Sequence, residues 1–327
     1  MVTRVLAVGE CMLEMRHTTS TDVVLGFAGD TYNTAVYLAR SAQALGVDVE
    51  VGYLCGLGDD IHSELMRQSW RREGIVDRSV TVPGKTPGLY FVRTDGQGER
   101  TFSYWRQGSA TAVLMAARNW ADSVEGDLIH LSGITLQLMT ARSLEGLVNR
   151  IYWLQTQGCR VSFDTNYRSS GWPSPQVAAT AIAAMASCSN VILATFEDEK
   201  ALFADKGPED TVRRYRALGA AEIVVKVGVE GAFVLQDDEL VHVPAVAVPH
   251  VVDTTAAGDS FGGAYLAARA AGFRPVAAAA MATAVAAVVV ANPGAIVPSA
   301  LIRTAVLSRR CGAGSARVAA GSVASTA

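Results

Sequence analysis

Short apolar segments rich in β-branched residues alternate with helical patterns along most of the chain, and this alternation constrains the fold more than any other feature. Strands separated by helices form βαβ units, which place parallel strands in one sheet and helices on both of its faces. We therefore predict a three-layer α/β fold whose doubly wound, mostly parallel sheet contains the segments 5–8, 49–54, 128–132, 160–163, 191–194, 223–227 and 232–235.

Polar residues follow several of these segments, where the carboxyl ends of the strands are expected. Glu10 follows the first segment, and polar loops follow later ones at 56–59, 164–168, 195–199 and 228–231. Ligands of open α/β sheets bind at this edge. We therefore expect a single site that gathers these loops.

The composition limits the class of protein. With 327 residues, 50% hydrophobic and 18% charged, the chain can bury the core of one large α/β domain or two smaller ones. A formal net charge of −3 gives no electrostatic case for a nucleic acid or an anionic membrane as partner. The apolar stretch 276–291 is shorter than the roughly 18 to 20 residues of a membrane span. It is predicted to be a buried helix that packs against other helices more than against a ligand.

The cysteines and the chain ends favour the cytoplasm. Five cysteines, at positions 11, 55, 159, 188 and 311, show no CxxC or metal-ligand spacing, and their odd number argues against a disulfide framework. The apolar run at 1–10 is too short for a secretory signal and is predicted to form a buried strand. Residues 308–327 are mostly small and lack a period, so they are predicted to form a loose, disordered tail.

Two segments break the βαβ pattern and predict a small second sheet. Residues 14–29 and 87–106 have the composition of short strands joined by turns, and Asp95-Gly96 is a strong hairpin signal in the second segment. Such a sheet can project from the main body as a lid over a site, or it can form a dimer contact. Both uses are open at this point.

Asp259 ends a turn of small residues, directly before a helical stretch at 261–271, in the sequence DTTAAGDSFGG. Backbone amides in such a turn, together with the positive end of the following helix, attract a phosphate group. A carboxylate beside a phosphate is unfavourable unless it has a task, and the best candidate task is to accept a proton from an incoming hydroxyl. The alternative is that Asp259 only caps its own helix.

Two motifs, in this order, resemble the signatures of the PfkB (ribokinase-like) carbohydrate kinases: GFAGDTYNTA at 26–35 and DTTAAGDSF at 253–261. The resemblance spans about residues 4–300 and implies a ribokinase-like fold, with a PfkB domain at 1–307 and a lid from about 14–29 and 87–106. Within the family, the chain most resembles the 2-keto-3-deoxygluconate kinases, through the segments GECM at 9–12, GERTF at 98–102, YWR at 104–106 and NYR at 166–168.

The resemblance implies that Asp259 is the catalytic base and that the backbone amides of Ala256, Ala257 and Gly258 form an anion hole. Most family members carry Gly where this chain has Ala256, which matters if the position needs a positive φ. The keto-deoxy-sugar subgroup resembles this chain in having Ala there.

A sugar-acid substrate is implied by the same likeness. Its carboxylate needs charge-assisted donors, which Arg106 and Arg168 can supply together with two tyrosines. The alternative for each arginine is a surface ion pair or a phosphate contact, and for the tyrosines it is packing within the hairpin. The implied substrate contacts are Gly29, Asp30, Asn33, Tyr90, Tyr104, Arg106, Asn166, Arg168 and Asp259.

ATP and Mg²⁺ are the implied cofactors. The nucleotide contacts implied by the resemblance are Lys226, Gly228, Gly231, Gly258 and Asn292. The family's Asn-x-x-Glu magnesium motif is altered to Thr195-Phe-Glu-Asp198-Glu199, so both Asp198 and Glu199 are candidates for orienting the water shell of the ion.

The implied activity is ATP-dependent phosphorylation of 2-dehydro-3-deoxy-D-gluconate at its terminal hydroxyl. If the lid hairpin also pairs with a second copy, we expect a homo-oligomer that forms through the lid. A fructokinase is the first alternative, although fructokinases typically continue past the lid arginine into an acidic residue, and here Gln107 follows. A sugar-sensing protein without turnover is the second alternative. An intact Asp259 argues against it.

Overall fold

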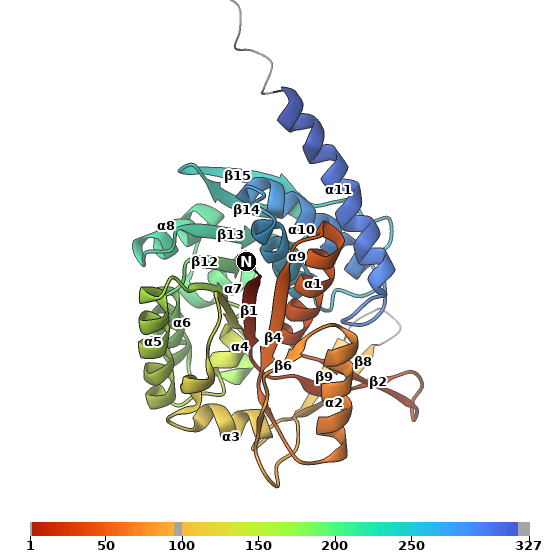
Figure 1. Ribbon diagram of the computed structural model, residues 1–327, viewed down its shortest axis with the longest axis vertical. Helices are drawn as coiled ribbons and strands as arrows, with labels where there is room; N and C mark the ends of the chain where they lie inside the picture. Colours follow the sequence, from red (N-terminus) through yellow and green to blue (C-terminus); the bar gives the residue numbers. More distant parts are fainter. Residues whose placement is uncertain (1, 95–99, 320–327) are drawn as a thin grey trace, which may run out of the picture.

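A nine-stranded sheet runs through the centre of the computed structural model, which describes residues 2–94 and 100–319 (Figure 1). The bounds of its strands are β1 Thr3–Val8, β4 Val49–Leu54, β6 Val76–Asp77, β10 Leu128–Ser132, β11 Arg160–Asp164, β12 Val191–Thr195, β13 Glu222–Lys226, β14 Gly231–Gln236 and β15 Glu239–Pro244. They lie in the order β15-β14-β13-β12-β11-β10-β1-β4-β6. The seven neighbouring strands β13, β12, β11, β10, β1, β4 and β6 are parallel to one another. At the other edge, β14 pairs antiparallel with β13, and β15 pairs antiparallel with β14.

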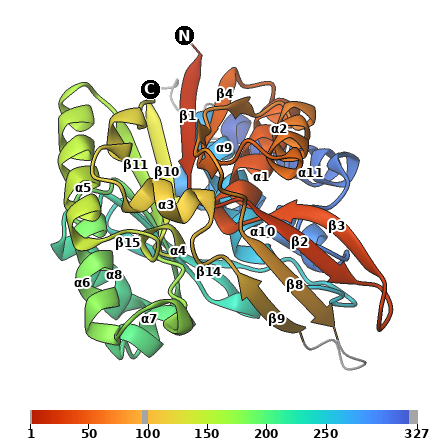
Figure 2. The same cartoon turned by 90° about the horizontal axis from the view of Figure 1, so that it is seen from below.

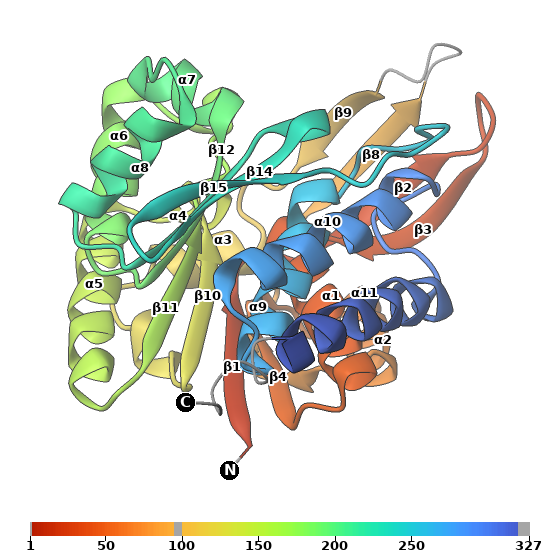
Figure 3. The same cartoon turned by 90° about the horizontal axis from the view of Figure 1, so that it is seen from above.

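Helices cover both faces of this sheet (Figures 2 and 3). One face carries α1 Asp30–Leu45, α2 Ile61–Arg72, α9 Ala257–Ala270, α10 Pro275–Val290 and α11 Ser299–Ala319. The other carries α3 Ala110–Ala116, α5 Ala141–Thr156, α6 Pro175–Ala186 and α8 Pro208–Ala217. The short helices α4 Gly133–Leu136 and α7 Phe196–Phe203 follow β10 and β12 directly. The predicted three-layer α/β fold with a mostly parallel sheet is therefore confirmed.

The sheet separates two hydrophobic cores because side chains alternate along each strand. In β12, Val191 and Leu193 belong to the core under α1 and α9, whereas Ile192 and Ala194 belong to the core under α5 and α6. A strand buried on both faces is apolar throughout, which is why these segments appear in the sequence as continuous apolar runs.

A second sheet of four strands projects from the carboxyl edge of the main sheet (Figure 3). Its strands are β2 Met12–His17, β3 Val23–Ala28, β8 Leu89–Thr94 and β9 Arg100–Trp105, in the order β3-β2-β8-β9. We call it the lid sheet. The predicted small sheet is thus confirmed, and the predicted hairpin turn at 95–99 lies outside the described residues. A further pair of short strands, β5 Gly56–Leu57 and β7 Val80–Thr81, joins in parallel near the main sheet.

The C-terminal helix differs from the sequence prediction. The loose tail was predicted to start at residue 308, but α11 continues to Ala319, and only residues 320–327 lie outside the described part. Alanine and arginine are strong helix formers, and extending a helix is easier than starting one, so the packed first half of α11 extends the helix into this segment. The apolar stretch 276–291 forms α10, as predicted, and none of the described helices is long and apolar enough to cross a membrane.

Candidate active site

Helix α9 begins at the predicted phosphate turn. Its first residue is Ala257, and the preceding Ala256 has a left-handed backbone with a φ of 58°. Asp259 lies in the first turn of the helix, and within the described residues no side chain caps the helix N-terminus. The alternative in which Asp259 acts as the N-cap is therefore wrong. Position 256 does need a positive φ, which costs an alanine roughly 1–2 kcal/mol.

Asp259 sits in a setting that suits a general base. Its Oδ2 accepts a hydrogen bond of 2.8 Å from Asn33 Nδ2, and Thr34 Oγ1 donates to its backbone carbonyl at 3.2 Å. Burial raises the pKa of the Asp259 carboxyl to about 7, with a further contribution from the negative charge of Asp30. A base with a pKa near the working pH is effective in proton transfer.

Asp30 and Asn166 meet beside this base. Asp30 begins α1, and its Oδ2 accepts hydrogen bonds from Asn166 Nδ2 at 3.0 Å and from Ser132 Oγ. Burial raises the pKa of the Asp30 carboxyl. Asn166 has a φ of 30°, so its backbone adopts a left-handed conformation that Asn tolerates better than most residues. The structure therefore brings together four predicted residues: Asp259, Asp30, Asn33 and Asn166.

Gly29 explains how Asp30 reaches this position. A Cβ atom on Gly29 would lie 2.1 Å from the carbonyl oxygen of Glu10. Only a residue without a side chain lets the start of α1 approach the end of β1 so closely. Gly29 thus positions Asp30 through the backbone.

The two arginines predicted to hold a substrate carboxylate both have acidic partners in the protein. Arg106 Nη2 lies 2.8 Å from Glu10 Oε2, and Arg168 Nη1 lies 3.0 Å from Asp198 Oδ2. The side chain of Glu10 is almost fully buried, and burial raises the pKa of its carboxyl. In the sequence, Glu10 stands out only as a polar residue at a strand end, and its pairing with Arg106 has no local signal because the two residues are far apart in the chain.

Tyr104 is influenced by both arginines. Burial raises the pKa of the Tyr104 hydroxyl, and the positive charges of Arg106 and Arg168 lower it in part. Tyr104 is nevertheless 54% exposed. Arg168 thus forms the ion pair that was the alternative, and its charge also acts on the Tyr104 hydroxyl together with that of Arg106.

Tyr90 packs within the lid sheet, as the alternative to a substrate contact predicted. It is buried, its hydroxyl donates to Glu14 Oε1 at 2.6 Å, and its ring contacts those of Phe102 and Tyr104. Its hydroxyl proton is therefore engaged within the lid sheet. Tyr104 is the better candidate for a substrate contact.

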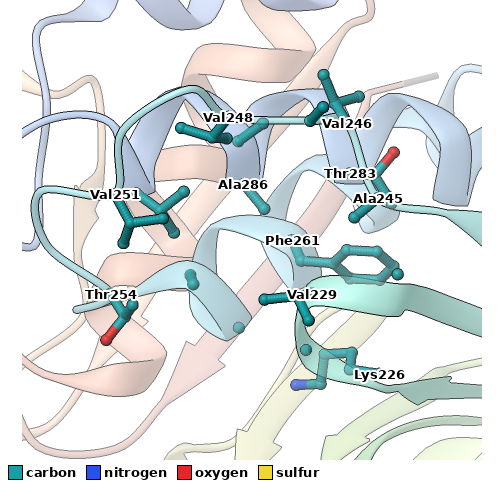
Figure 4. A pocket seen from close by; sticks show the side chains of 17 residues that line it. Lys226, Val229, Ala245, Val246, Val248, Val251, Thr254, Phe261, Thr283 and Ala286 are labelled. Carbon is teal, nitrogen blue, oxygen red and sulfur yellow. The ribbon is translucent and has the colours of Figure 1, made fainter.

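A cavity of about 550 Å³ opens beside the start of α9 (Figure 4). Four of the five predicted nucleotide residues line it, namely Lys226, Gly228, Gly231 and Gly258. Asn292 is absent from its lining and instead donates its side-chain amide to the carbonyl of Val288 at 2.8 Å, which closes the end of α10. The structure therefore does not bring Asn292 together with the other four residues, and its nucleotide contact stays a prediction.

Much of the cavity wall comes from residues that the sequence motifs do not include. One part is the segment after β15, with Ala245, Val246, Ala247, Val248 and Val251. Another is a face of α10 with Thr283, Ala286, Ala287 and Val290, although α10 was predicted to pack against helices more than against a ligand. Such a wall is apolar and made of small residues, and it carries no distinctive sequence signal. An apolar pocket with few polar groups is typical of small-molecule sites.

Of the two candidate magnesium residues, Asp198 forms the ion pair with Arg168, whereas Glu199 is held inside the protein. The side chain of Glu199 is 2% exposed and accepts hydrogen bonds from Arg214 Nη2 at 3.0 Å and from the Tyr215 hydroxyl at 2.9 Å. These bonds tie α7 to α8, so Glu199 is a structural residue and is removed from the metal site. Asp198 offers two carboxylate oxygens, the ligand type that Mg²⁺ prefers. The described residues contain no group of three or more His, Cys, Asp or Glu side chains able to hold a metal.

Comparison with known proteins identifies the family. Residues 2–301 match the pfkB family of carbohydrate kinases. The 2-dehydro-3-deoxygluconokinase of Dickeya dadantii strain 3937 is 37% identical over 313 residues, which cover 91% of this chain and 98% of that protein. The protein of the same name from Escherichia coli K12 is 37% identical over 304 residues, which cover 90% of this chain and 97% of that one. This chain therefore belongs to the pfkB family of carbohydrate kinases.

The fold comparison agrees with this assignment. The crystal structure of fructokinase with bound ATP from Xylella fastidiosa superimposes with a TM-score of 0.78 at 23% identity, covering 95% of this chain and 99% of that one. The ribokinase-like fold that the sequence motifs implied is confirmed.

Proposed function

We propose that this kinase transfers the γ-phosphoryl group of ATP to the 6-hydroxyl of 2-dehydro-3-deoxy-D-gluconate, giving 2-dehydro-3-deoxy-6-phospho-D-gluconate and ADP. One observation carries the proposal: Asp259, with a pKa of about 7, lies between a nucleotide-sized cavity and a polar group formed by Asp30, Asn33 and Asn166. The relatives named 2-dehydro-3-deoxygluconokinase, which are 33–37% identical over most of the chain, support the choice of sugar.

In the proposed reaction, Asp259 accepts the proton of the sugar hydroxyl as the oxygen attacks the terminal phosphorus. The positive end of α9 and the amides of its first turn stabilise the phosphoryl charge, and Ala257 N–H has only a long bond of 3.3 Å to the Thr254 carbonyl to give up. Asp30, Asn33 and Asn166 hold the sugar hydroxyls.

A carboxylate on the sugar matches the other side of the site. The positive charges of Arg106 and Arg168 both act on the Tyr104 hydroxyl, and a carboxylate bound among these three side chains would accept charge-assisted hydrogen bonds from them. Glu10 and Asp198 balance the two arginines in the protein alone. A neutral ketose does not need two cations in this place, which favours a sugar acid over fructose.

ATP is the proposed nucleotide, and ATP is also what the superimposed fructokinase contains. Mg²⁺ is proposed because nucleotide phosphates require a divalent ion in phosphoryl transfer, where it neutralises the developing charge. Asp198 is the residue of this chain that we propose to orient the water shell of the ion.

We also propose a cytoplasmic homo-oligomer without nucleic acid or membrane partners. The four cysteines that the structure describes are free and buried, as in a reducing compartment. The lid sheet is the proposed contact between copies, because it exposes large apolar side chains.

A coupled ADP-release assay tests the proposed activity. The purified protein is supplied with Mg-ATP and a panel of 2-keto-3-deoxy acids, fructose and ribose. We expect the highest kcat/KM with 2-dehydro-3-deoxygluconate. A preference for fructose would establish the fructokinase alternative, and no turnover with any sugar would favour the non-catalytic alternative.

A further inference from the structure

Lys226 and Asp164 form a buried ion pair across the carboxyl edge of the sheet. Lys226 is the last residue of β13 and Asp164 is the last residue of β11, so the pair passes over the end of β12, which lies between them. Lys226 Nζ donates to Asp164 Oδ2 at 2.7 Å, and the residues are 8% and 4% exposed. Burying an ammonium group is unfavourable unless a partner balances it, and Asp164 provides that balance.

The ammonium group lies at the anion-binding turn. A Cβ atom on Gly258 would approach Lys226 Nζ to 3.4 Å, and both residues line the 550 Å³ cavity. Figure 4 shows the amino group of Lys226 extending beneath the start of α9. An ammonium group has three N–H donors, and Asp164 takes one of them. The others can reach a phosphoryl oxygen held at the amides of this turn.

We propose that Lys226 is a catalytic residue that binds the transferred phosphoryl group, and that Asp164 is a positioning residue that holds its ammonium group at the turn. The inference rests on the proposed kinase activity, but not on the identity of the sugar. During transfer, the bond between the γ-phosphorus and the bridging oxygen of ADP breaks, and the bond from the sugar oxygen to phosphorus forms. The hydroxyl proton goes to Asp259, and Lys226 keeps its protons throughout.

The pair also controls the charge around the base. Three charged groups act on Asp259: Asp30 and Asp164 raise its pKa, and Lys226 lowers it. The ammonium of Lys226 and the carboxylate of Asp164 therefore have opposite effects on the pKa of Asp259. Removing one member should therefore shift the titration of Asp259 in the direction set by the member that is left.

Nucleotide binding distinguishes this role from a purely structural one. Lys226→Met and Asp164→Asn are compared with Lys206→Met, which removes an exposed lysine outside the site. Affinities for ADP and for a non-hydrolysable ATP analogue with Mg²⁺ are measured by calorimetry, without sugar. We expect Lys226→Met to weaken the analogue at least ~10-fold while leaving ADP affinity nearly unchanged, because only the analogue carries a γ-phosphoryl group. An equal loss for both ligands would overturn the proposal.

Kinetics supply the second measurement. Lys226→Met should lower kcat by about 10²–10³-fold, with a smaller change in the KM for the sugar. This is the effect typical of removing one preorganised donor that stabilises the charge of a transition state. The acidic limb of its pH–rate profile should move to higher pH, and that of Asp164→Asn to lower pH. Shifts in the same direction, or an unchanged kcat for Lys226→Met, would contradict the proposal.

Two controls keep the results interpretable. If Lys226→Met does not fold, Lys226→Gln keeps a donor to Asp164 without the charge and takes its place in both measurements. If no sugar is phosphorylated by the wild type, the proposed function fails, whereas the difference between the ATP analogue and ADP still tests Lys226 by itself.

Discussion

Asp259 is a buried carboxylate, which lowers the stability of the fold, and the same carboxylate is the proposed base of the reaction. Asp259→Asn keeps the shape of the side chain and an oxygen able to accept from Asn33, but it removes the base. We expect kcat to fall by about 10²–10⁴-fold with the KM for the sugar largely kept. The same change removes a buried charge, so the melting temperature at neutral pH should rise. A near-normal kcat would remove Asp259 from the chemistry.

The raised pKa of Asp259, at about 7, has a sign that can be checked in the wild type. The active form is the deprotonated carboxylate, so kcat/KM should increase with pH up to about 7 and then level off. The stability of the protein should change in the opposite direction. Because the folded state binds the proton of Asp259 more tightly than the unfolded state, the contribution of Asp259 to the free energy of unfolding falls as the pH rises from about 4 to about 7. A pH–rate profile and thermal melts at several pH values measure both trends. An acidic limb centred near 4 would contradict the assignment.

The sequence motifs predict which residues belong to the site, but they do not predict the burial or the charged partners of these residues. The motifs pointed to Asp30, Asn33 and Asp259, and the structure brings these residues together. The pKa of Asp259 depends on burial and on Asp30, more than two hundred residues away in the chain. The ion pairs of Arg106 with Glu10 and of Arg168 with Asp198 were missed for the same reason, because an ion pair between residues far apart in the chain has no local sequence pattern.

The junction between β3 and α1 is the element on which the sugar side of the site depends. Gly29→Ala would place a Cβ atom against the Glu10 carbonyl, so the start of α1 must move, and Asp30 with it. We expect a loss of roughly 1–3 kcal/mol in unfolding free energy, as for other overpacked sites, and a higher KM for the sugar. Denaturant unfolding and steady-state kinetics measure the two effects.

The matched control is Gly146→Ala in the middle of α5, where the added Cβ meets its nearest neighbour at 3.4 Å. Alanine favours a helix over glycine, so this variant should be stabilised by about 0.5–1 kcal/mol with unchanged kinetics. Similar stability for the two variants would show that the close approach at Gly29 is unimportant.

Element types were more predictable than the surfaces they present. Strands such as β4 and β10 follow from apolar runs between turn residues, and α10 follows from a long apolar stretch. Because α10 is apolar on all sides, its sequence cannot tell which side packs on α9 and which side lines the cavity. The extension of α11 to Ala319 was missed because composition alone does not show that a packed helix precedes the segment.

On the scale of the whole molecule, the carboxyl edge of one sheet organises the site. The ends of β1, β11 and β13 supply Glu10, Asp164 and Lys226, and α9 brings Asp259 from the last third of the chain. This convergence was predictable, because parallel strands all end at the same edge. The lid sheet contributes Tyr104 to the sugar side, and Arg106 follows directly after β9. On its other face, Leu13, Phe27 and Leu89 pack on the main core, whereas Leu25 and Trp105 farther out are exposed.

That other face of the lid sheet predicts how copies of the chain associate. The strand register places Met15, Leu25 and Phe91 on the face opposite Tyr90, and the Trp105 ring lies 5.5 Å from that of Phe91. Leu25 is 43% exposed and Trp105 is 60% exposed. An exposed apolar face of this kind on a projecting sheet favours pairing with a second copy.

We expect light scattering to show a dimer or a larger assembly for the wild type. Trp105→Lys should raise the dissociation constant of this assembly by about 30-fold or more, because a buried interface tryptophan typically contributes about 2 kcal/mol or more. Trp153→Lys is the matched control: Trp153 is 52% exposed on α5, where it packs against Arg150 on the opposite side of the main sheet. It should leave the mass unchanged. A monomeric wild type, or equal effects of the two substitutions, would exclude the lid sheet as the interface.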